Sequence, residues 1–366
     1  MKVTLFHLGF SEYVMGLANA LAQEVEVEVI HPLNLERVCS SLTNDNVKLT
    51  SFSKPRLRRD PRNLPAITHA FDLIKSSRPD ILHVQESCDY AYDLYSVIAR
   101  MPPLVTTIHD VVPHPGDGHA APGLQYTKAV SCWRSSRLIV HTDRMRHQLA
   151  KRFHVRTEKI DVIPHGELGS LYRDIARSSG ISVERRDPHT LLFFGRIWPY
   201  KGLRYLLEAF SLVKREIPEA HLVIAGQGGD LAANEAAIRS LGGIEVIDRF
   251  IPVERIASLF ERSTIVVLPY VEASQSGVAA IGYTMGTVVV ASNVGGFAEF
   301  IQDQKTGVLV EPRCPSSIAA AIIALLNDRE KQSHIRENAH ALGRSTISWE
   351  TIAQQTLNTY RHVLNG

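Results

Sequence analysis

The stretch that most constrains the fold runs from residue 268 to residue 299. It begins at the end of a β-branched run, Ile265–Leu268, which is typical of a buried strand. Pro269 ends that run, a polar loop follows, and an alanine-rich segment leads through Gly286 to a second β-branched run at 288–291. A strand, a helical segment and a second strand in this order predict a parallel β-α-β unit.

The loop of this unit carries polar side chains where the first strand ends. Glu272 is the carboxylate, and Gln275, Ser276, Gly277 and Val278 stand at the expected helix start. Ligands bind at the carboxyl ends of strands in open parallel sheets, and the unpaired N–H groups of a helix start suit a phosphate. We favour a phosphate site here. The alternative is an ordinary crossover with a glycine-containing turn.

Length and composition bound the class of protein. The 366 residues predict two domains, and 45% apolar with 21% charged residues is typical of a soluble globular chain. A net charge of +2 gives no general argument for nucleic acid. No apolar run reaches the length of about 18–20 residues that spans a bilayer. Polar residues interrupt the N-terminal apolar stretch, so we expect no signal peptide. The chain has four scattered cysteines, Cys39, Cys88, Cys132 and Cys314, and no CxxC pair. This spacing argues against a zinc site or a disulfide framework and favours a reducing cytoplasm.

Strand-like and helix-like segments alternate through both halves of the chain. Strands are predicted at 2–8, 25–30, 80–84, 104–108, 138–141, 160–164, 190–194, 221–225, 244–247, 265–268, 288–291 and 307–310. Helical spacing is found at 12–22, 67–76, 203–213, 253–260, 316–326, 328–342 and 349–364. The pattern predicts the α/β class with Rossmann-like domains. The first turn lacks GxGxxG, so a dinucleotide cofactor is not supported.

His109 is the first choice among the histidines, because it follows the strand predicted at 104–108 and so lies at a carboxyl end. Asp110 either orients His109 or caps the turn that follows. The alternative for His109 is a core histidine whose ring is satisfied by neighbouring groups. The loop after it, 112–123, is rich in proline, glycine and histidine.

Two cations flank a turn after the strand at 190–194. Arg196 and Lys201 are placed to neutralise a diphosphate, one as a guanidinium fork and the other as a point charge. Arg196 directly follows a buried strand, where we expect an unpaired charge to cost free energy. We therefore favour anion binding over surface solvation for Arg196. The next strand ends at Gly226 and Gly228, which predict either a nucleotide base or ribose loop or a plain turn.

The most basic stretch of the chain lies at 54–62. Two prolines exclude a continuous helix through it. A solvated surface loop is the favoured interpretation, and the alternative is a contact with an anionic membrane or a phosphate-bearing acceptor. Its cations are Lys54, Arg56, Arg58, Arg59 and Arg62.

Five motifs, GRIWPYKG, HLVIAGQGGD, LPYVEASQSG, MGTVVVASNVGGFAEFI and TGVLVEP, together resemble the C-terminal half of the retaining, family 4 type glycosyltransferases. The N-terminal half carries a weaker resemblance, in His83, the THD at 107–110, IVHTD and VIPHG. The resemblance implies the GT-B fold, with two Rossmann-like domains facing across a cleft. It implies an acceptor-side domain at 1–168, a nucleotide-sugar domain at 188–345, and a helix at 346–366 that crosses back to the first domain. The linker at 169–187 is predicted from composition, because 168–187 is a polar, irregular stretch rich in serine, arginine and glycine.

The resemblance also implies roles for the donor-side residues. Arg196 and Lys201 match the pair that binds the donor diphosphate, and residues 275–278 match the helix start whose amides meet the phosphate. Glu272 matches the first carboxylate of the E-x7-E motif, which contacts sugar hydroxyls. The position of the second carboxylate holds Ile281, so a ribose ligand is missing.

Two further positions follow from the resemblance. His109 matches the N-domain histidine near the donor sugar, and Gly9 matches the turn near the acceptor. Glu299, which the resemblance does not assign, is the candidate substitute for the missing carboxylate. No metal site is expected, since the sequence contains no Asp-x-Asp, and no cofactor is expected beyond the sugar nucleotide.

The function implied is a retaining, metal-independent hexosyl transfer from a nucleoside-diphosphate sugar to a glycan or lipid-linked acceptor, in cell-surface polysaccharide biosynthesis. The expected location is the cytoplasm, with the inner face of the membrane as a candidate place. Two alternatives stay open: a nucleotide-sugar epimerase of the same fold, and a non-catalytic nucleotide-sugar-binding partner of another transferase. The sequence does not specify the base, the sugar, the acceptor or the oligomeric state.

Overall fold

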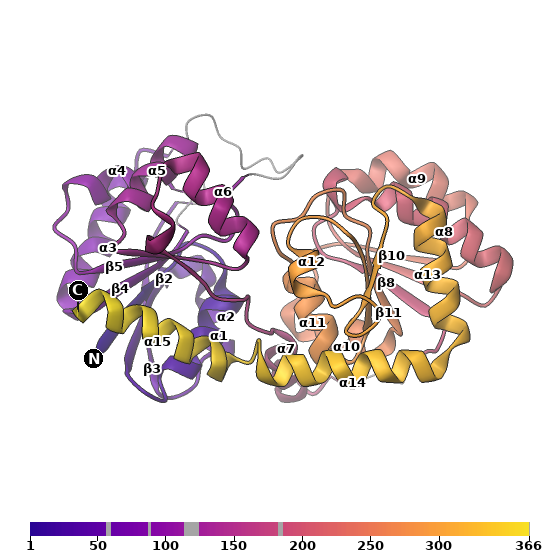
Figure 1. Cartoon of the computed structure of the whole chain (residues 1–366). Coiled ribbons are helices and arrows are strands. Elements are labelled where there is room, and N and C mark those ends of the chain that lie inside the picture. The colour runs from indigo at the N-terminus through magenta and orange to yellow at the C-terminus, as the bar shows by residue number, and fades with distance from the viewer. Residues whose placement is uncertain (56–59, 87–88, 113–123, 182–185, 366) are drawn as a thin grey trace. The chain divides into compact units, whose positions relative to one another are not determined.

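A computed structural model describes residues 1–55, 60–86, 89–112, 124–181 and 186–365. The chain forms two compact units (Figure 1). The first holds the described residues up to Gly166 together with the C-terminal segment from Ser348, and the second holds the described residues from Glu167 to Ile347. The chain therefore passes between the units twice. At these passages the backbone N–H of Glu167 donates to the carbonyl of Ile347, 2.9 Å away.

The first unit is built on a seven-stranded parallel sheet in the order β3-β2-β1-β4-β5-β6-β7. Six of its strands lie where the alternation predicts them, and β3 is the one that the sequence pattern did not predict. The alternation of Val and Glu at 25–30 predicts a strand with one face in water, which was wrong: β2 is buried from Val27 on, and Glu28 is only 3% exposed. The strands are β1 (Lys2–Phe6), β2 (Glu26–Pro32), β3 (Val47–Phe52), β4 (Ile81–Gln85), β5 (Leu104–Thr107), β6 (Arg137–Val140) and β7 (Ile160–Val162).

Helices cover the first sheet, and the last helix of the chain is one of them. α15 packs against α1, as predicted for a C-terminal helix that returns to the first domain. Trp349 anchors it, because its indole occupies the space where Cβ atoms at Gly16 and Gly166 would stand. The helices are α1 (Ser11–Leu21), α2 (Glu36–Leu42), α3 (Asn63–Ser77), α4 (Tyr90–Ile98), α5 (Leu124–Arg134), α6 (Asp143–Phe153) and α15 (Trp349–Asn365), with 3₁₀ turns η1 (Leu33–Leu35) and η2 (Thr157–Lys159).

The second unit is built on a six-stranded parallel sheet in the order β10-β9-β8-β11-β12-β13. All six strands were predicted, and the central ones are short apolar runs buried on both faces. The strands are β8 (Thr190–Phe194), β9 (His221–Gly226), β10 (Ile244–Asp248), β11 (Ile265–Leu268), β12 (Val288–Ser292) and β13 (Val308–Val310).

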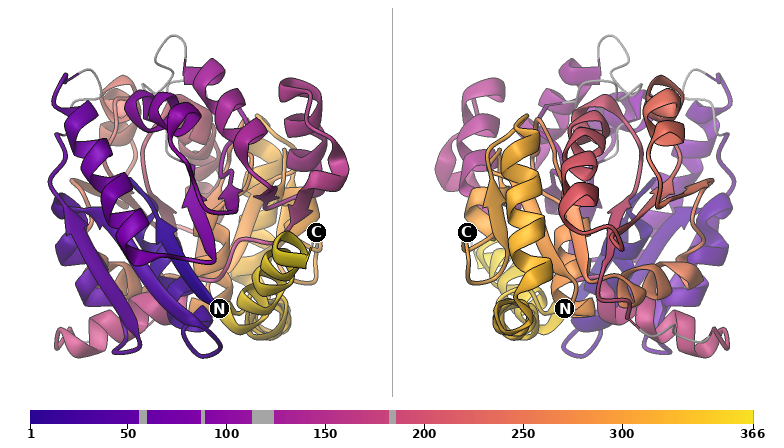
Figure 2. Two further views of the ribbon diagram at one scale, coloured as in Figure 1. Left: turned by 90° about the vertical axis from the view of Figure 1, so that its left-hand side faces the viewer. Right: turned by 90° about the vertical axis from the view of Figure 1, so that its right-hand side faces the viewer.

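The helices of the second unit lie on both faces of its sheet. On one face α8 (Leu203–Glu216) and α13 (Pro315–Asn327) lie side by side over the strands (Figure 2, right). On the other face lie α10 (Val253–Arg262), α11 (Gly277–Met285) and α14 (Arg329–Ser345). The remaining helices are α7 (Gly169–Ser178), α9 (Asp230–Ser240), α12 (Phe297–Phe300) and the 3₁₀ turn η3 (Pro199–Lys201).

The start of the expected linker is helical. Residues 169–178, expected to be irregular from their composition, form α7, and α7 packs against α10 and α11. The polar composition of this segment hid one buried stripe, Tyr172, Ile175 and Ala176. The irregular interpretation was therefore wrong for this part, and the first passage between units lies at Gly166–Glu167.

Candidate active site

The donor-side candidates lie where the second sheet reverses its strand order. In the sheet β8 lies between β9, which is the next strand in sequence, and β11. The loop after β8 carries Arg196 and Lys201, and the loop after β11 carries Glu272 and Gln275. Both loops leave the carboxyl ends of adjacent strands, the position at which open α/β sheets bind ligands.

Lys201 is the buried cation of this site. The residue is only 7% exposed, and its Nζ donates to the hydroxyl of Tyr270, 2.7 Å away. Nζ also lies 4.6 Å from the centroid of the Tyr270 ring. Among the residues that the structure describes, no carboxylate forms an ion pair with Lys201. Burial, with a smaller contribution from the charge of Arg196, lowers the pKa of Lys201 to about 8.

Arg196 differs from the expectation. It is exposed, so the argument that burial makes its charge costly was wrong for Arg196 and holds instead for Lys201. The guanidinium is nevertheless close enough to Lys201 and Tyr270 for its charge to lower the pKa of both groups. The two expected cations are therefore near each other, with one in solvent and the other enclosed.

The N-terminus of α11 lies beside Lys201. A Cβ atom at Gly195 would lie 3.2 Å from Lys201 Nζ and 4.0 Å from Cγ2 of Val278 in the first turn of α11. Ser276, the residue before the helix, does not cap it with its side chain. The first N–H groups of α11 and the ammonium of Lys201 thus flank one place, and a helix start without a side-chain cap favours an anion there.

The loop after β11 is held by close backbone contacts on both sides. A Cβ atom at Gly202 would overlap the carbonyl of Pro269, and one at Gly295 would overlap the carbonyl of Ala273. Both glycines have positive φ, 72° and 56°. The N–H of Val271 donates to the carbonyl of Tyr200, 2.8 Å away. These contacts fix the loop that carries Glu272 and Gln275.

Gly226 and Gly228 have a packing role in the structure. A Cβ atom at Gly226 would overlap the carbonyl of Gly195, and one at Gly228 would overlap that of Ile197. Their turn is hydrogen-bonded to the β8 loop, for example from Ile197 N–H to the carbonyl of Gln227 at 2.9 Å. The close approach explains both glycines without a ligand, which favours the plain turn; contact with a nucleotide stays a prediction.

The carboxylates expected to meet the donor are exposed. Glu272 lies in the β11 loop and Glu299 lies in α12, and both are on the surface of the unit. Ile281 lies one turn into α11 and is 3% exposed. The roles of Glu272 and Glu299, and the missing second carboxylate, stay predictions.

Two buried polar atoms on the site loops have no hydrogen-bond partner among the described residues. They are Nε1 of Trp198, in the β8 loop, and Oε1 of Gln275, just before α11. Buried polar atoms are nearly always satisfied, so unsatisfied ones at a site indicate atoms that a ligand or water completes. Gln275 was predicted as a donor contact, whereas Trp198 and Tyr270 were missed, although both stand in motifs that carry predicted ligands.

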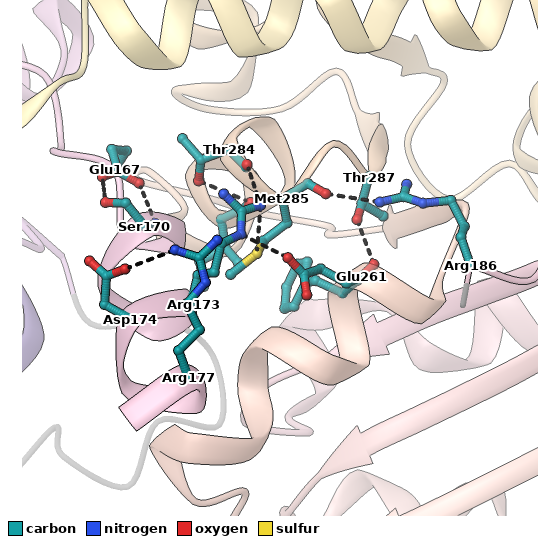
Figure 3. Close-up of polar contacts among 12 residues, drawn as sticks. Glu167, Ser170, Arg173, Asp174, Arg177, Arg186, Glu261, Thr284, Met285 and Thr287 are labelled. Carbon is teal, nitrogen blue, oxygen red and sulfur yellow. Dashed lines mark hydrogen bonds and ion pairs between the residues drawn. The ribbon is translucent and has the colours of Figure 1, made fainter. Parts of the chain in front are cut away.

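The opposite end of α11 is capped by arginines (Figure 3). Arg173 of α7 donates to the carbonyl of Thr284 at 3.1 Å and to Oε1 of Glu261 at 2.8 Å. Arg186 donates to the carbonyls of Met285, at 2.9 Å, and of Gly286. Cations at a helix C-terminus complement its dipole, so α11 is stabilised at the end away from the predicted phosphate.

In the first unit His109 is enclosed rather than open to solvent. It is 1% exposed, and Phe10 stacks on its ring with 4.0 Å between centroids. Its Nε2 lies 2.9 Å from the side-chain amide of Gln85, and its Nδ1 lies 3.0 Å from Nε2 of His141. Both ring nitrogens are thus engaged, and Gln85 and His141, not Asp110, orient the ring.

The hydrogen bonds fix the tautomer of His109. Nδ1 of His141 lies 3.0 Å from the carbonyl of Ile163, so it donates, and Nε2 of His141 accepts from Nδ1–H of His109. Nε2 of neutral His109 is then also an acceptor, so the Gln85 amide must turn its NH2 group towards it. Burial lowers the pKa of both rings, to about 3 for His141, which keeps them neutral. This arrangement agrees with the core-histidine alternative, and direct contact of His109 with a sugar stays a prediction.

The turn after β1 contains the acceptor-side candidate. A Cβ atom at Gly9 would have no neighbour within 4 Å, so packing does not require a glycine there. Its carbonyl accepts a hydrogen bond from Nδ1 of His7 at 2.6 Å. The next residue, Phe10, has a left-handed backbone with φ 62° and is 40% exposed. An aromatic residue seldom adopts this conformation, which occurs preferentially near functional sites.

The basic stretch is partly neutralised within the chain. Lys54 pairs with Asp89 at 2.8 Å, and Arg62 pairs with Asp60 at 2.7 Å. The other three cations, Arg56, Arg58 and Arg59, lie outside the described residues, as do most of the loop at 112–123 and Cys88. Contact with a membrane through this stretch stays a prediction.

The remaining expectations concern metals, thiols and membrane spans. Within the described ranges, no group of three or more histidine, cysteine, aspartate or glutamate side chains is arranged to hold a metal ion. Three cysteines, Cys39, Cys132 and Cys314, are free thiols. None of the helices in the described part of the chain has the length and apolar character needed to cross a membrane.

Two family models match the chain, one in each unit. The model described as Glycosyltransferase Family 4 matches residues 9–166, and the model described as Glycosyl transferases group 1 matches residues 188–328. A D-inositol 3-phosphate glycosyltransferase of Paenarthrobacter aurescens is 26% identical, over 98% of this chain and 94% of that protein. A glycogen synthase of Mycobacterium tuberculosis is 27% identical, over 80% of this chain and 71% of that protein.

Solved structures share the fold over the whole chain. Anabaena HepE in complex with UDP-glucose has a TM-score of 0.75 at 18% identity, with 99% of this chain and 100% of that chain covered. Sucrose-phosphate synthase of Thermosynechococcus elongatus has a TM-score of 0.74 at 18% identity, with 100% and 99% covered. Since both halves match the same family and the neighbours share their architecture, this chain belongs to the family 4 type of glycosyltransferases and is an enzyme with the GT-B fold.

Proposed function

We propose that the protein transfers a hexosyl group, with retention and without a metal ion, from a nucleoside-diphosphate sugar to a glycan or lipid-linked acceptor. The proposed setting is cell-surface polysaccharide biosynthesis. One observation carries the donor assignment: a buried ammonium, Lys201, lies beside the uncapped N-terminus of α11 with no carboxylate partner among the described residues. A buried cation without a counter-charge is costly, and the leaving diphosphate would supply that charge.

The chemistry requires stabilisation of two developing charges. Breaking the bond between the anomeric carbon and the phosphate oxygen leaves negative charge on the nucleoside diphosphate and positive charge on the sugar. Arg196, Lys201 and the start of α11 stabilise the diphosphate, the role that a divalent metal takes in other transferases. Glu272 orients the sugar through its hydroxyl groups. The acceptor hydroxyl loses its proton to the departing phosphate oxygen as its own oxygen bonds to the anomeric carbon.

The relatives guide the choice of substrates to assay. UDP-glucose comes first among donors, because HepE, which shares the fold, was crystallised in complex with it. D-inositol 3-phosphate comes first among small acceptors, because the Paenarthrobacter relative is named for it. A lipopolysaccharide precursor or lipid-linked sugar is the next acceptor class, because the structural neighbour WaaG, TM-score 0.64, is described as acting in lipopolysaccharide biosynthesis.

The test measures nucleotide binding and turnover in matched variants. Lys201→Met removes the ammonium but keeps much of the aliphatic volume, and Arg196→Ala removes the exposed cation. A melting-temperature screen with UDP, GDP and ADP first identifies the nucleotide that the wild-type protein binds. We expect each substitution to weaken binding of that nucleotide by roughly 10- to 100-fold, because a hydrogen bond from a charged group contributes roughly 1.5–3 kcal/mol. Arg204→Ala is the control, because Arg204 is an exposed cation of α8 that contacts Tyr205.

Wild-type affinity in Lys201→Met would refute the diphosphate assignment. Turnover of the donor with acceptor should continue in EDTA, and a complete loss that Mg²⁺ or Mn²⁺ restores would refute metal independence. Product analysis with and without acceptor separates transfer from epimerisation, because an epimerase converts the donor alone.

A further inference from the structure

Tyr270 links the two halves of the predicted diphosphate site. It lies two residues after the end of β11 and is 3% exposed. Its hydroxyl accepts a hydrogen bond from Lys201 and is also bonded to the side chain of Ser276, at the start of α11. An ammonium has donors only, so the phenolic hydrogen is left for Ser276. One hydroxyl group therefore connects the buried cation with the first residues of the helix.

The surroundings of Lys201 make Tyr270 its main stabilising partner. The titratable and charged groups that face Lys201 are Tyr200, Tyr270 and Arg196. Arg196 repels the ammonium, and the ring of Tyr200 lies farther from Nζ, at 5.9 Å, than the 4.6 Å of the Tyr270 ring. Tyr270 thus supplies both an oxygen lone pair and an aromatic face to a cation that burial disfavours.

The Tyr270 ring is itself fixed. It packs edge-on against Tyr200, with 5.9 Å between centroids, and at a tilt against Phe297 of α12, with 5.3 Å between centroids. Burial raises the pKa of Tyr270, so the hydroxyl stays neutral and acts by hydrogen bonding rather than as a counter-ion. A neutral acceptor holds the ammonium in place but leaves its charge uncompensated, which suits a site that must receive an anion.

We propose that Tyr270 is a positioning residue that holds the Lys201 ammonium and the Ser276 side chain in the arrangement that receives the donor diphosphate. The inference rests on the proposed donor site. Tyr270 acts on the diphosphate through Lys201 and Ser276.

The test is the removal of one oxygen atom. Tyr270→Phe keeps the ring and its packing but removes the hydroxyl. With the nucleotide that the wild-type protein binds, we expect roughly a five- to tenfold weaker affinity, typical of one lost hydrogen bond. Titration calorimetry across a pH series from neutral to alkaline gives the second readout. Wild-type affinity should fall as the pH rises through about 8, where Lys201 loses its proton.

In Tyr270→Phe this fall should move to lower pH by roughly half a unit or more, because the lost oxygen favoured the charged form of Lys201. A purely structural role of Tyr270 would not move it. Tyr283→Phe is the matched control: Tyr283 is also buried, in α11, and its hydroxyl bonds Thr306 at 2.8 Å instead of a site residue. Affinity and pH dependence should match the wild type there.

Lys201→Arg checks the origin of the pH dependence, since a guanidinium stays charged and should abolish the fall seen in the wild type. A fall that persists in Lys201→Arg, or an unmoved fall in Tyr270→Phe, would overturn the positioning role. If Tyr270→Phe does not fold, Ser276→Ala serves instead: weaker binding supports the link and unchanged binding overturns it. A wild-type protein that binds no nucleotide would refute the proposed function itself.

Discussion

At the scale of single residues, glycines decide how the donor loops are held. Gly202 follows Lys201 and has φ 72°, and its α-carbon faces the carbonyl of Pro269 too closely for a side chain. The contact brings the β8 loop against the β11 loop. Gly180 has nearly the same φ, 67°, but a Cβ atom there would meet nothing within 4 Å. A substitution at Gly180 therefore measures the cost of the left-handed backbone alone, whereas one at Gly202 measures that cost together with the steric overlap.

We expect Gly202→Ala to lower the free energy of unfolding by roughly 2–4 kcal/mol, which combines about 1 kcal/mol for the left-handed backbone with the cost of moving Pro269. Gly180→Ala should cost only about 1 kcal/mol. Urea denaturation of both variants gives the comparison. Equal losses of unfolding free energy in the two variants would show that the β8 and β11 loops can move apart at no cost, and would contradict the steric argument.

At the scale of elements, α11 is a short helix with a distinct environment at each end. Its first residue, Gly277, stands beside the predicted phosphate, and its last carbonyls accept hydrogen bonds from Arg173 and Arg186 (Figure 3). Burial, with smaller contributions from Arg336 and Arg173, lowers the pKa of Arg186 to about 10. The Arg186 guanidinium is thus partly buried, where it donates hydrogen bonds to the carbonyls at the end of α11.

Removal of this cap should destabilise the second unit. Arg186→Ala leaves the carbonyls of Met285 and Gly286 without these partners, so we expect a loss of about 1–3 kcal/mol. Arg177→Ala is the control, because the side chain of Arg177 is 71% exposed and its ion pair with Asp174 spans 3.6 Å. Its expected effect is within about 0.5 kcal/mol. Similar losses in both variants, measured by urea denaturation, would disprove the capping role.

At the scale of the molecule, the two units differ in how they should respond to acid. The fully buried histidines of the described residues lie in the first unit. Burial lowers the pKa of His7, His83 and His141 to about 3, that of the half-buried His165 to about 4, and that of His109 well below its ordinary value. Unfolded, these side chains titrate near about 6.5.

Between about pH 6.5 and about pH 4, the unfolded first unit therefore binds more protons than the folded one. Its stability is complete above about pH 6.5 and is lost as the pH falls, by about 1 kcal/mol per pH unit for each such histidine. Hydrogen exchange at neutral pH and at about pH 5 should show that the first unit loses protection before the second. His83→Gln, which does not titrate, should lessen the loss. Parallel loss in both units would contradict the prediction.

The sequence alone determined the fold class and which candidate residues stand at the carboxyl ends of the strands. Short apolar runs that alternate with amphipathic segments give parallel α/β sheets, because each run must be buried and each crossover must be long enough to return. The ends of those runs place Arg196, Lys201 and Glu272 at carboxyl edges without any knowledge of tertiary contacts. The strand β3, by contrast, was missed: its only signal is a short alternation of apolar and polar residues, Val47 to Thr50, which Ser51 interrupts.

Only the tertiary structure decided which of these residues are buried and what they touch. It exposed Arg196, whose charge was expected to be costly because of burial, and it enclosed Lys201 against Tyr270, a partner 69 residues away in sequence. It gave Gly226 a packing role and left Gly9 without one. Burial and hydrogen bonding depend on contacts between segments remote in sequence, which periodicity and motif spacing do not encode.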